Sequence, residues 1–346
     1  MGTTFLMILL TILFIVVALY GCVYNRDGQN NFWSVDYTKT LKGLFCIIVV
    51  LVHIPLPYQN TIQDMIGSFG YIGVTFFFMS SAYGLKYGVV NKKNYLNSFW
   101  ENRGLAIVIP AITVNIVSLI VNIIYKQSIE KPIIYFILSI DNWVTILLLY
   151  YVVFWILYKF FPTYKYKDII VCMFVVFTSL LEKFTVIQHT FIWPTEVYGF
   201  IYGILFFYIK DKYEEWGKSN YNKKSITMMV LAGFLGVLYL KCKFIYFWGD
   251  YLLKIALGFA IILFLLQITT KIRIGNKINS FLGSISYEIY LGEYVIFKLL
   301  NMKNYEFQSA TYIYCSVVLI VILATILHFI INKNLIKCVQ KAIDSL

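Results

Sequence analysis

The stretch Lys42-Gly-Leu-Phe-Cys-Ile-Ile-Val-Val-Leu-Val-His53 is apolar between an ionisable residue at each end. As an α-helix, the eleven steps from Lys42 to His53 turn about 1100°, about 20° past three full turns, so both side chains lie on one face. The two residues are about 16 Å apart along the axis, roughly half the hydrocarbon thickness of a bilayer. A cation at the membrane edge with a proton-transfer group beneath it indicates catalysis inside a membrane.

The whole chain has the composition of an integral membrane protein. Of its 346 residues, 60% are hydrophobic and only 13% are charged, against about 25% in soluble domains. Residues 132–141 are apolar but too short to cross, so we expect them at the outer surface. The sequence predicts an all-α membrane protein with about eleven transmembrane helices, at residues 5–24, 41–56, 69–88, 105–125, 143–161, 168–185, 191–209, 225–240, 251–268, 282–300 and 310–331.

Basic residues are spread unevenly over the loops that join these segments. When alternate loops are assigned to opposite sides, most of the 29 Lys and Arg residues fall on one side. The positive-inside rule makes that side cytoplasmic, which places the N-terminus outside and the C-terminus inside. The net charge of +12 is therefore mainly a topology signal, with some attraction for anionic lipid or a phosphorylated substrate, and we expect no nucleic-acid partner.

The sequence offers no pattern typical of a metal site. Its six cysteines include no CxxC pair, and no predicted helix carries Cys and His at a metal-ligand spacing. It also lacks the GxSxG and HExxH motifs. We therefore expect neither a bound metal nor a disulfide framework.

Charged residues inside the predicted spans are costly, which makes each of them a candidate for function. The span 282–300 contains Glu288 and Glu293, and packing alone explains two glutamates poorly, so at least one should face the interior of the bundle. Arg103 lies seven residues before Pro110 at the cytoplasmic start of a span, and its planar fork suits a phosphate. Structural interpretations stay open beside these: a topology anchor for Lys42 and for Arg103, a core histidine for His53, and a headgroup-boundary position for Glu288.

Six further ionisable residues give weaker signals. Asp141, Glu196, Asp250 and Lys254 lie near span ends, where water can reach them. The histidines His189 and His328 are most simply structural.

Several of these stretches occur in the order typical of one family. The chain resembles the acyltransferase-3 family, polytopic bacterial enzymes that O-acylate surface polysaccharides and related glycans. The family's Arg/Lys-x10-His element is matched by Lys42 and His53. The run Gly73-Val-Thr-Phe-Phe-Phe-Met-Ser-Ser-Ala-Tyr83 is similar to its next helix, and Leu282-Gly-Ser-Ile-Ser-Tyr-Glu-Ile-Tyr-Leu-Gly-Glu293 is similar to a later signature that usually ends in histidine.

Three positions depart from the family pattern. Ala82 stands where glycine is usual, Ile107 replaces a second arginine, and Glu293 occupies the position of the histidine. The last departure removes one imidazole and assigns any acid–base role at that position to a carboxylate.

The resemblance covers about residues 33–331 and implies a ten-helix core. Residues 1–32 then form an extra N-terminal transmembrane helix with a cytoplasmic linker, and residues 332–346 form a basic cytoplasmic tail. The resemblance also implies an O-acyltransferase, most simply an O-acetyltransferase, in the bacterial plasma membrane. The donor would be cytoplasmic acetyl-CoA and the acceptor a sugar hydroxyl of a capsular or other surface polysaccharide, or of its lipid-linked precursor.

The resemblance assigns roles to individual residues. His53 would act as general base or carry the acyl group, and its ordinary pKa of about 6.5 suits either role. Glu293 would share the acid–base chemistry, and Ser81, with Tyr83, would polarise the thioester carbonyl. Lys42 and Arg103, both at the cytoplasmic edge, would bind the phosphates of coenzyme A.

Two other classes of function stay open on the sequence. A transporter or flippase of a lipid-linked saccharide would also need intramembrane glutamates and basic loops, although no paired broken helices are apparent. A non-catalytic partner of a glycan assembly complex is favoured by the departures at Ala82, Ile107 and Glu293.

Overall fold

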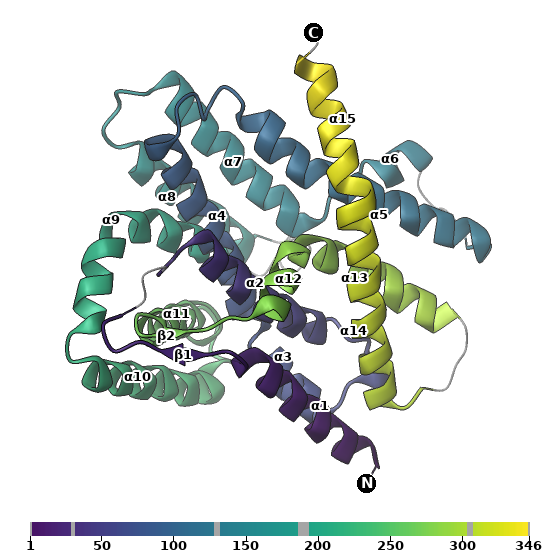
Figure 1. Ribbon diagram of the computed structural model, residues 1–346, viewed down its shortest axis with the longest axis horizontal. Coiled ribbons are helices and arrows are strands. Elements are labelled where there is room, and N and C mark those ends of the chain that lie inside the picture. The colour runs from purple at the N-terminus through teal and green to yellow at the C-terminus, as the bar shows by residue number, and fades with distance from the viewer. Residues whose placement is uncertain (1, 29–31, 128–131, 186–193, 303–306, 345–346) are drawn as a thin grey trace.

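The computed structural model describes residues 2–28, 32–127, 132–185, 194–302 and 307–344, and these form a bundle of helices (Figure 1). Two short strands, β1 (Val23–Tyr24) and β2 (Ile272–Arg273), pair antiparallel. The α-helices are α1 (Gly2–Leu19), α2 (Val35–Val52), α3 (Thr61–Gly67), α4 (Gly70–Asn91), α5 (Leu105–Ile124), α6 (Ile133–Ile137), α7 (Asn142–Phe160), α8 (Lys167–Phe184), α9 (Tyr198–Lys218), α10 (Tyr221–Cys242), α11 (Lys254–Thr269), α12 (Lys277–Ser284), α13 (Ser286–Met302), α14 (Ser309–Ile326) and α15 (Lys333–Asp344).

The helical membrane fold predicted from the sequence is confirmed. Six helical stretches of the described residues are long and apolar enough to cross a membrane: 61–91, 100–124, 142–160, 221–242, 248–269 and 309–343. The predicted number of eleven spans stays a prediction. Shorter or more charged helices occupy the other predicted spans; α2, for example, carries Asp36, Lys39 and Lys42 within its eighteen residues.

Apolar side chains cover the outside of the bundle as well as its inside. None of the residues of α10 is buried, and large apolar side chains of α1, α8 and α10 are exposed. Such a surface is stable in contact with lipid, since helices satisfy their own backbone hydrogen bonds there. At the C-terminal end, α14 and α15 continue one another through a π-helical segment and form a long rod that projects from the bundle (Figure 1).

Glycines bring two pairs of helices into backbone contact. Gly199 and Gly203 of α9 form a GxxxG pattern, and a Cβ at either would overlap a carbonyl oxygen of α4, that of Thr75 or Met79. Gly43 of α2 and Gly283 of α12 form a reciprocal contact in the same way, against the carbonyl oxygens of Asn279 and Lys39. Small residues allow this close packing where lipid gives no hydrophobic drive for helices to associate.

Three π-helical segments interrupt the α-helical stretches, at Trp100–Gly104, Trp248–Leu253 and Leu327–Asn332. Each contains polar side chains that contact other segments: Arg103 in the first, Asp250 in the second, and His328 and Asn332 in the third. A π-turn changes the direction of the following side chains, and such turns are frequent at functional sites.

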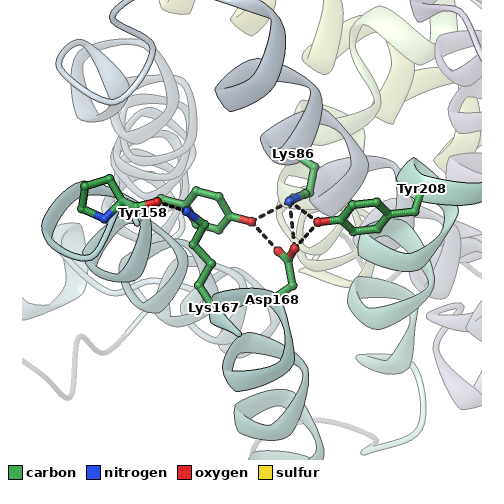
Figure 2. Close-up of polar contacts among 6 residues, drawn as sticks. Lys86, Tyr158, Lys167, Asp168 and Tyr208 are labelled. Carbon is green, nitrogen blue, oxygen red and sulfur yellow. Dashed lines mark hydrogen bonds and ion pairs between the residues drawn. The ribbon is translucent and has the colours of Figure 1, made fainter. Parts of the chain in front are cut away.

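A buried lysine connects four helices at the predicted cytoplasmic side. Lys86 of α4 donates hydrogen bonds to Asp168 (2.9 Å), Tyr158 (2.6 Å) and Tyr208 (2.8 Å), which belong to α8, α7 and α9 (Figure 2). Both tyrosine hydroxyls also donate to the Asp168 carboxylate. Because the charges are mutually satisfied, we interpret this cluster as a structural connection between the four helices.

Replacing Lys86 by Met should strongly destabilise the bundle, because it leaves the Asp168 carboxylate without its cation. Losing one partner of a buried ion pair costs about 3–5 kcal/mol. The double variant Lys86→Met/Asp168→Leu should regain most of this loss. The measurement is the unfolding temperature of the purified protein in detergent, followed by intrinsic fluorescence. Equal unfolding temperatures for Lys86→Met and the unmodified protein would contradict the structural role.

Candidate functional site

His53 and Glu293 are hydrogen-bonded across two helices. His53 is the C-cap residue of α2, and the prolines at positions 55 and 57 prevent the helix from continuing. Its Nδ1 lies 2.5 Å from Oε1 of Glu293 on α13. The imidazole is 42% exposed, whereas the carboxylate is only 7% exposed. The carboxylate is therefore buried and positions an imidazole that is open to its surroundings.

This pair lines a cavity of about 560 Å³, the outer cavity, which lies between α2, α5, α7 and α13. Asp141, Asn115 and Ser139 add polar groups to its wall. Asn115 of α5 donates to the carbonyl oxygens of Ile137 (2.9 Å) and Ser139 (2.6 Å), which fixes the end of α6 beside the cavity. The segment 132–141, predicted as a surface piece, thus forms a short helix whose end closes one side of the outer cavity.

Asp141 connects the outer cavity to α13. As the N-cap of α7, its Oδ1 accepts a hydrogen bond from the backbone N–H of Trp143 at 2.9 Å. The same oxygen accepts a hydrogen bond from the Tyr290 hydroxyl at 2.5 Å. This carboxylate therefore fixes the start of α7 and the orientation of the Tyr290 ring together.

Lys42 and Arg103 line a second cavity of about 310 Å³, the inner cavity, together with Ser81, Tyr151 and Tyr287. Arg103 reaches it from the first π-helical segment, and its Nε donates to the Tyr95 hydroxyl at 3.3 Å. Within the described part of the chain, neither Lys42 nor Arg103 forms an ion pair with a carboxylate. Two unneutralised cations in one cavity make it suitable for an anion.

The inner and outer cavities meet at two aromatic residues. Trp143 and Tyr290 line both of them. The helix α2 also reaches both, with Lys42 and Val49 in the inner cavity and His53 in the outer one. Trp143 and Tyr290 are therefore shared between the cavity of Lys42 and the cavity of the His53 imidazole.

The structure groups the predicted site residues into two sets. His53 and Glu293 lie together in the outer cavity, whereas Lys42, Arg103 and Ser81 share the inner cavity. Ser81 is hydrogen-bonded to the Tyr151 hydroxyl at 2.5 Å and does not line the cavity of the His53 imidazole. Tyr83 is in neither cavity and packs among aromatic rings, among them Trp33 and Phe206.

The other ionisable candidates have partners elsewhere. Glu288 is buried and accepts from His328 Nδ1 at 2.8 Å and from Asn332 at 3.1 Å, so both glutamates of the predicted span face the interior. Lys254 pairs with the buried Glu196 at 2.7 Å, and Asp250 pairs with Lys183 at 2.5 Å. These residues therefore hold helices together; His189 lies outside the described residues.

Sequence reasoning missed the residues that join the two sets. Tyr290 and Tyr287 belong to the stretch Leu282 to Glu293, and their three-residue spacing on one helix face was the available signal. Nothing local indicated that Asp141, expected to be solvated, would bind Tyr290. Lys86 was also overlooked, although it is a charged residue inside a predicted span.

The His53–Glu293 pair suits proton transfer. When the Nδ1–H of His53 donates a hydrogen bond to the Glu293 carboxylate, Nε2 carries the lone pair that a general base needs. In the described part of the chain, no cluster of three or more His, Cys, Asp or Glu residues is placed to hold a metal ion.

Comparison with known families gives one match. The family model of the acyltransferase domain, Acyl_transf_3, matches residues 35–329. The comparisons with curated proteins and with solved structures gave no significant match. The matched region begins at the first residue of α2, includes both cavities, and ends within the last π-helical segment. The chain therefore belongs to the acyltransferase-3 family of membrane acyltransferases.

Proposed function

We propose that the protein transfers an acetyl group from cytoplasmic acetyl-CoA to a sugar hydroxyl at the outer face of a bacterial plasma membrane. The observation that carries the proposal is that α2 borders two cavities, which also share lining residues. Lys42 and Arg103, which form no ion pair with a described carboxylate, border the inner one, and a carboxylate-bound histidine borders the outer one. We expect the acceptor to be a capsular or other surface polysaccharide, or its lipid-linked precursor.

The dimensions of the site agree with the length of such a donor. Along an α-helix, Lys42 and His53 are about 16 Å apart, and the extended pantetheine arm of coenzyme A has a length on the order of 15–20 Å at the bond spacings of an extended chain. Phosphates held by Lys42 and Arg103 would therefore let the thioester reach the boundary at Tyr290 and Trp143. The acceptor hydroxyl would approach from the outer cavity.

The chemical step follows from this placement. His53 Nε2 takes the proton of the acceptor hydroxyl while the hydroxyl oxygen attacks the thioester carbonyl carbon, giving a tetrahedral oxyanion. The carbon–sulfur bond then breaks, and the departing thiolate takes the proton from the imidazolium. Glu293 stabilises the imidazolium in the interval, as the carboxylate of a catalytic triad does. The Tyr290 hydroxyl, which donates to Asp141, would lie beside both substrates in this scheme.

His53→Ala should reduce acetyl transfer by about 10²–10⁴-fold, which is the usual contribution of a general base. The measurement is transfer of radiolabelled acetate from acetyl-CoA to glycan by the purified protein in nanodiscs. His328→Ala is the matched control, because it removes the histidine of the other His–Glu pair, which lines neither cavity. Full activity of His53→Ala at the same protein level would overturn the catalytic assignment.

Glu293→Gln should lower turnover while leaving the Michaelis constant for acetyl-CoA nearly unchanged. A neutral amide occupies the same space but cannot stabilise the imidazolium, and the carboxylate lies outside the inner cavity. Steady-state kinetics at varied acetyl-CoA test this separation. A raised Michaelis constant with unchanged turnover would instead place Glu293 in donor binding.

Lys42→Ala should raise the Michaelis constant for acetyl-CoA by about 10-fold or more, the usual effect of losing a hydrogen bond to a charged group. Lys42→Arg keeps the charge and should be much milder. Lys298→Ala is a control within α13, because Lys298 donates to Asn122 and lines neither cavity. Equal losses in Lys42→Ala and Lys42→Arg would argue against phosphate binding by this residue.

The acceptor is tested in cells. The O-acetyl signals in the NMR spectrum of the surface glycan should disappear when the gene is deleted and return with the unmodified gene but not with His53→Ala. Glycan that reaches the surface normally but lacks acetyl groups supports the transferase. Loss of the glycan from the surface, with its acetylation unaffected, would favour a flippase.

A further inference from the structure

A third cavity opens where α2 and α12 begin, at the predicted cytoplasmic side. It has a volume of about 480 Å³, and we refer to it as the basal cavity. Its charged lining residues are Lys39, Arg273 and Lys277, with Asp36 as the only acidic one. None of the three cations forms an ion pair within the described residues. The basal cavity therefore has an excess of positive charge that a multivalent anion would neutralise.

Hydrogen-bond donors accompany these charges. Thr40 lines the basal cavity and is only 5% exposed, yet its hydroxyl has no hydrogen-bond partner among the described residues. Gly275 faces it with a φ of +148°, and a Cβ there would come within 2.9 Å of the Thr40 side chain. Glycine at this position keeps the space beside the hydroxyl open. The Thr40 hydroxyl oxygen is not among the fully buried atoms that lack a partner, so it is accessible to a polar ligand in the basal cavity.

The two helices contribute further positive potential. Ser34 and Asn276, the N-cap residues of α2 and α12, both line the basal cavity. The N-terminal end of a helix carries a partial positive charge and favours anions, phosphates in particular. The positive potential of the two helix ends adds to the positive charge of Lys39, Arg273 and Lys277.

The basal cavity is next to the inner cavity. Lys39 and Lys42 are three residues apart on α2, a rise of about 4.5 Å, and they line the basal and the inner cavity respectively. Across from them, Ser284 lines the first and Ser286 the second. Two separate sets of cations in adjacent cavities match a ligand with two separate phosphate groups.

We infer that the basal cavity binds the 3′-phosphate of the adenosine end of a coenzyme A thioester. This inference rests on the proposed function, in which Lys42 and Arg103 bind the diphosphate of the same molecule. The 3′-phosphate is a phosphomonoester with up to two negative charges, and it lies at the end of the donor farthest from the thioester. An anionic lipid headgroup presents a phosphate too, so the test separates these two sources.

The test measures binding of two probes to the full chain in nanodiscs of phosphatidylcholine, by calorimetry. Adenosine 3′,5′-bisphosphate should bind about 10-fold or more tightly than adenosine 5′-monophosphate, because only the first has a 3′-phosphate for the cations. The variant Lys39→Ala/Arg273→Ala/Lys277→Ala should bind both probes equally. Lys277→Ala alone, which replaces an exposed side chain, should reduce the preference in part, and Thr40→Val should reduce it as well.

Lys223→Ala is the control, because it removes an exposed lysine of α10 that does not line the basal cavity. It should keep the full preference for the bisphosphate. A preference that survives in the triple variant, or that is missing from the unmodified protein, would overturn the inference. The inference would also be overturned if the substitutions had an effect only in discs with phosphatidylglycerol and the protein did not discriminate the two nucleotides. That result would identify a lipid headgroup as the ligand.

The outcome is independent of the proposed reaction. If the protein discriminates the two nucleotides through these residues but transfers no acetyl group, the binding site stands and the proposed function fails. If acetyl transfer occurs and acetyl-CoA and its 3′-dephospho analogue are used equally well, the reaction stands and the inference fails.

Discussion

Hydrocarbon tolerates a charged side chain only if the charge is paired or borders a cavity that admits water or a charged ligand. This constraint divides the cations of the bundle into two groups. Lys86, Lys183 and Lys254 are paired with carboxylates of other segments, Lys86 with Asp168, Lys183 with Asp250, and Lys254 with Glu196. Lys42 and Arg103 have no such partner among the described residues and border the inner cavity. The paired ions hold helices together, and the unpaired ions are the ones available to a ligand.

The same helix carries the two kinds of chemistry that an acyl transfer needs. On α2, Lys42 borders the inner cavity and His53 the outer one, so the backbone itself sets the distance between anion binding and proton transfer. Tyr290 and Trp143 line both cavities, and Asp141 accepts hydrogen bonds from the Tyr290 hydroxyl and from the backbone N–H of Trp143. In the proposed reaction, the donor would occupy the inner cavity and the acceptor the outer one, with these two shared side chains beside both.

Much of this could be predicted from local sequence. The shared face of Lys42 and His53 and the interior position of Glu293 follow from helical periodicity and the cost of burying charge. The partners could not be predicted, because they are distant in sequence: 240 positions separate His53 from Glu293. Helix packing decides these contacts and leaves no local signal. Asp141 shows the same limit on prediction, because the sequence does not distinguish a solvated N-cap carboxylate from one that also binds another helix.

The reciprocal contact between Gly43 and Gly283 has a consequence for how the molecule keeps its alignment. Each glycine lies against a backbone carbonyl of the other helix, so α2 and α12 cannot slide past one another without a steric clash. Only Ile285 separates α12 from α13, which carries Glu293. The absence of side chains at Gly43 and Gly283 thus fixes the position of α12 along α2, and with it the alignment of the His53 imidazole on α2 with the Glu293 carboxylate on α13.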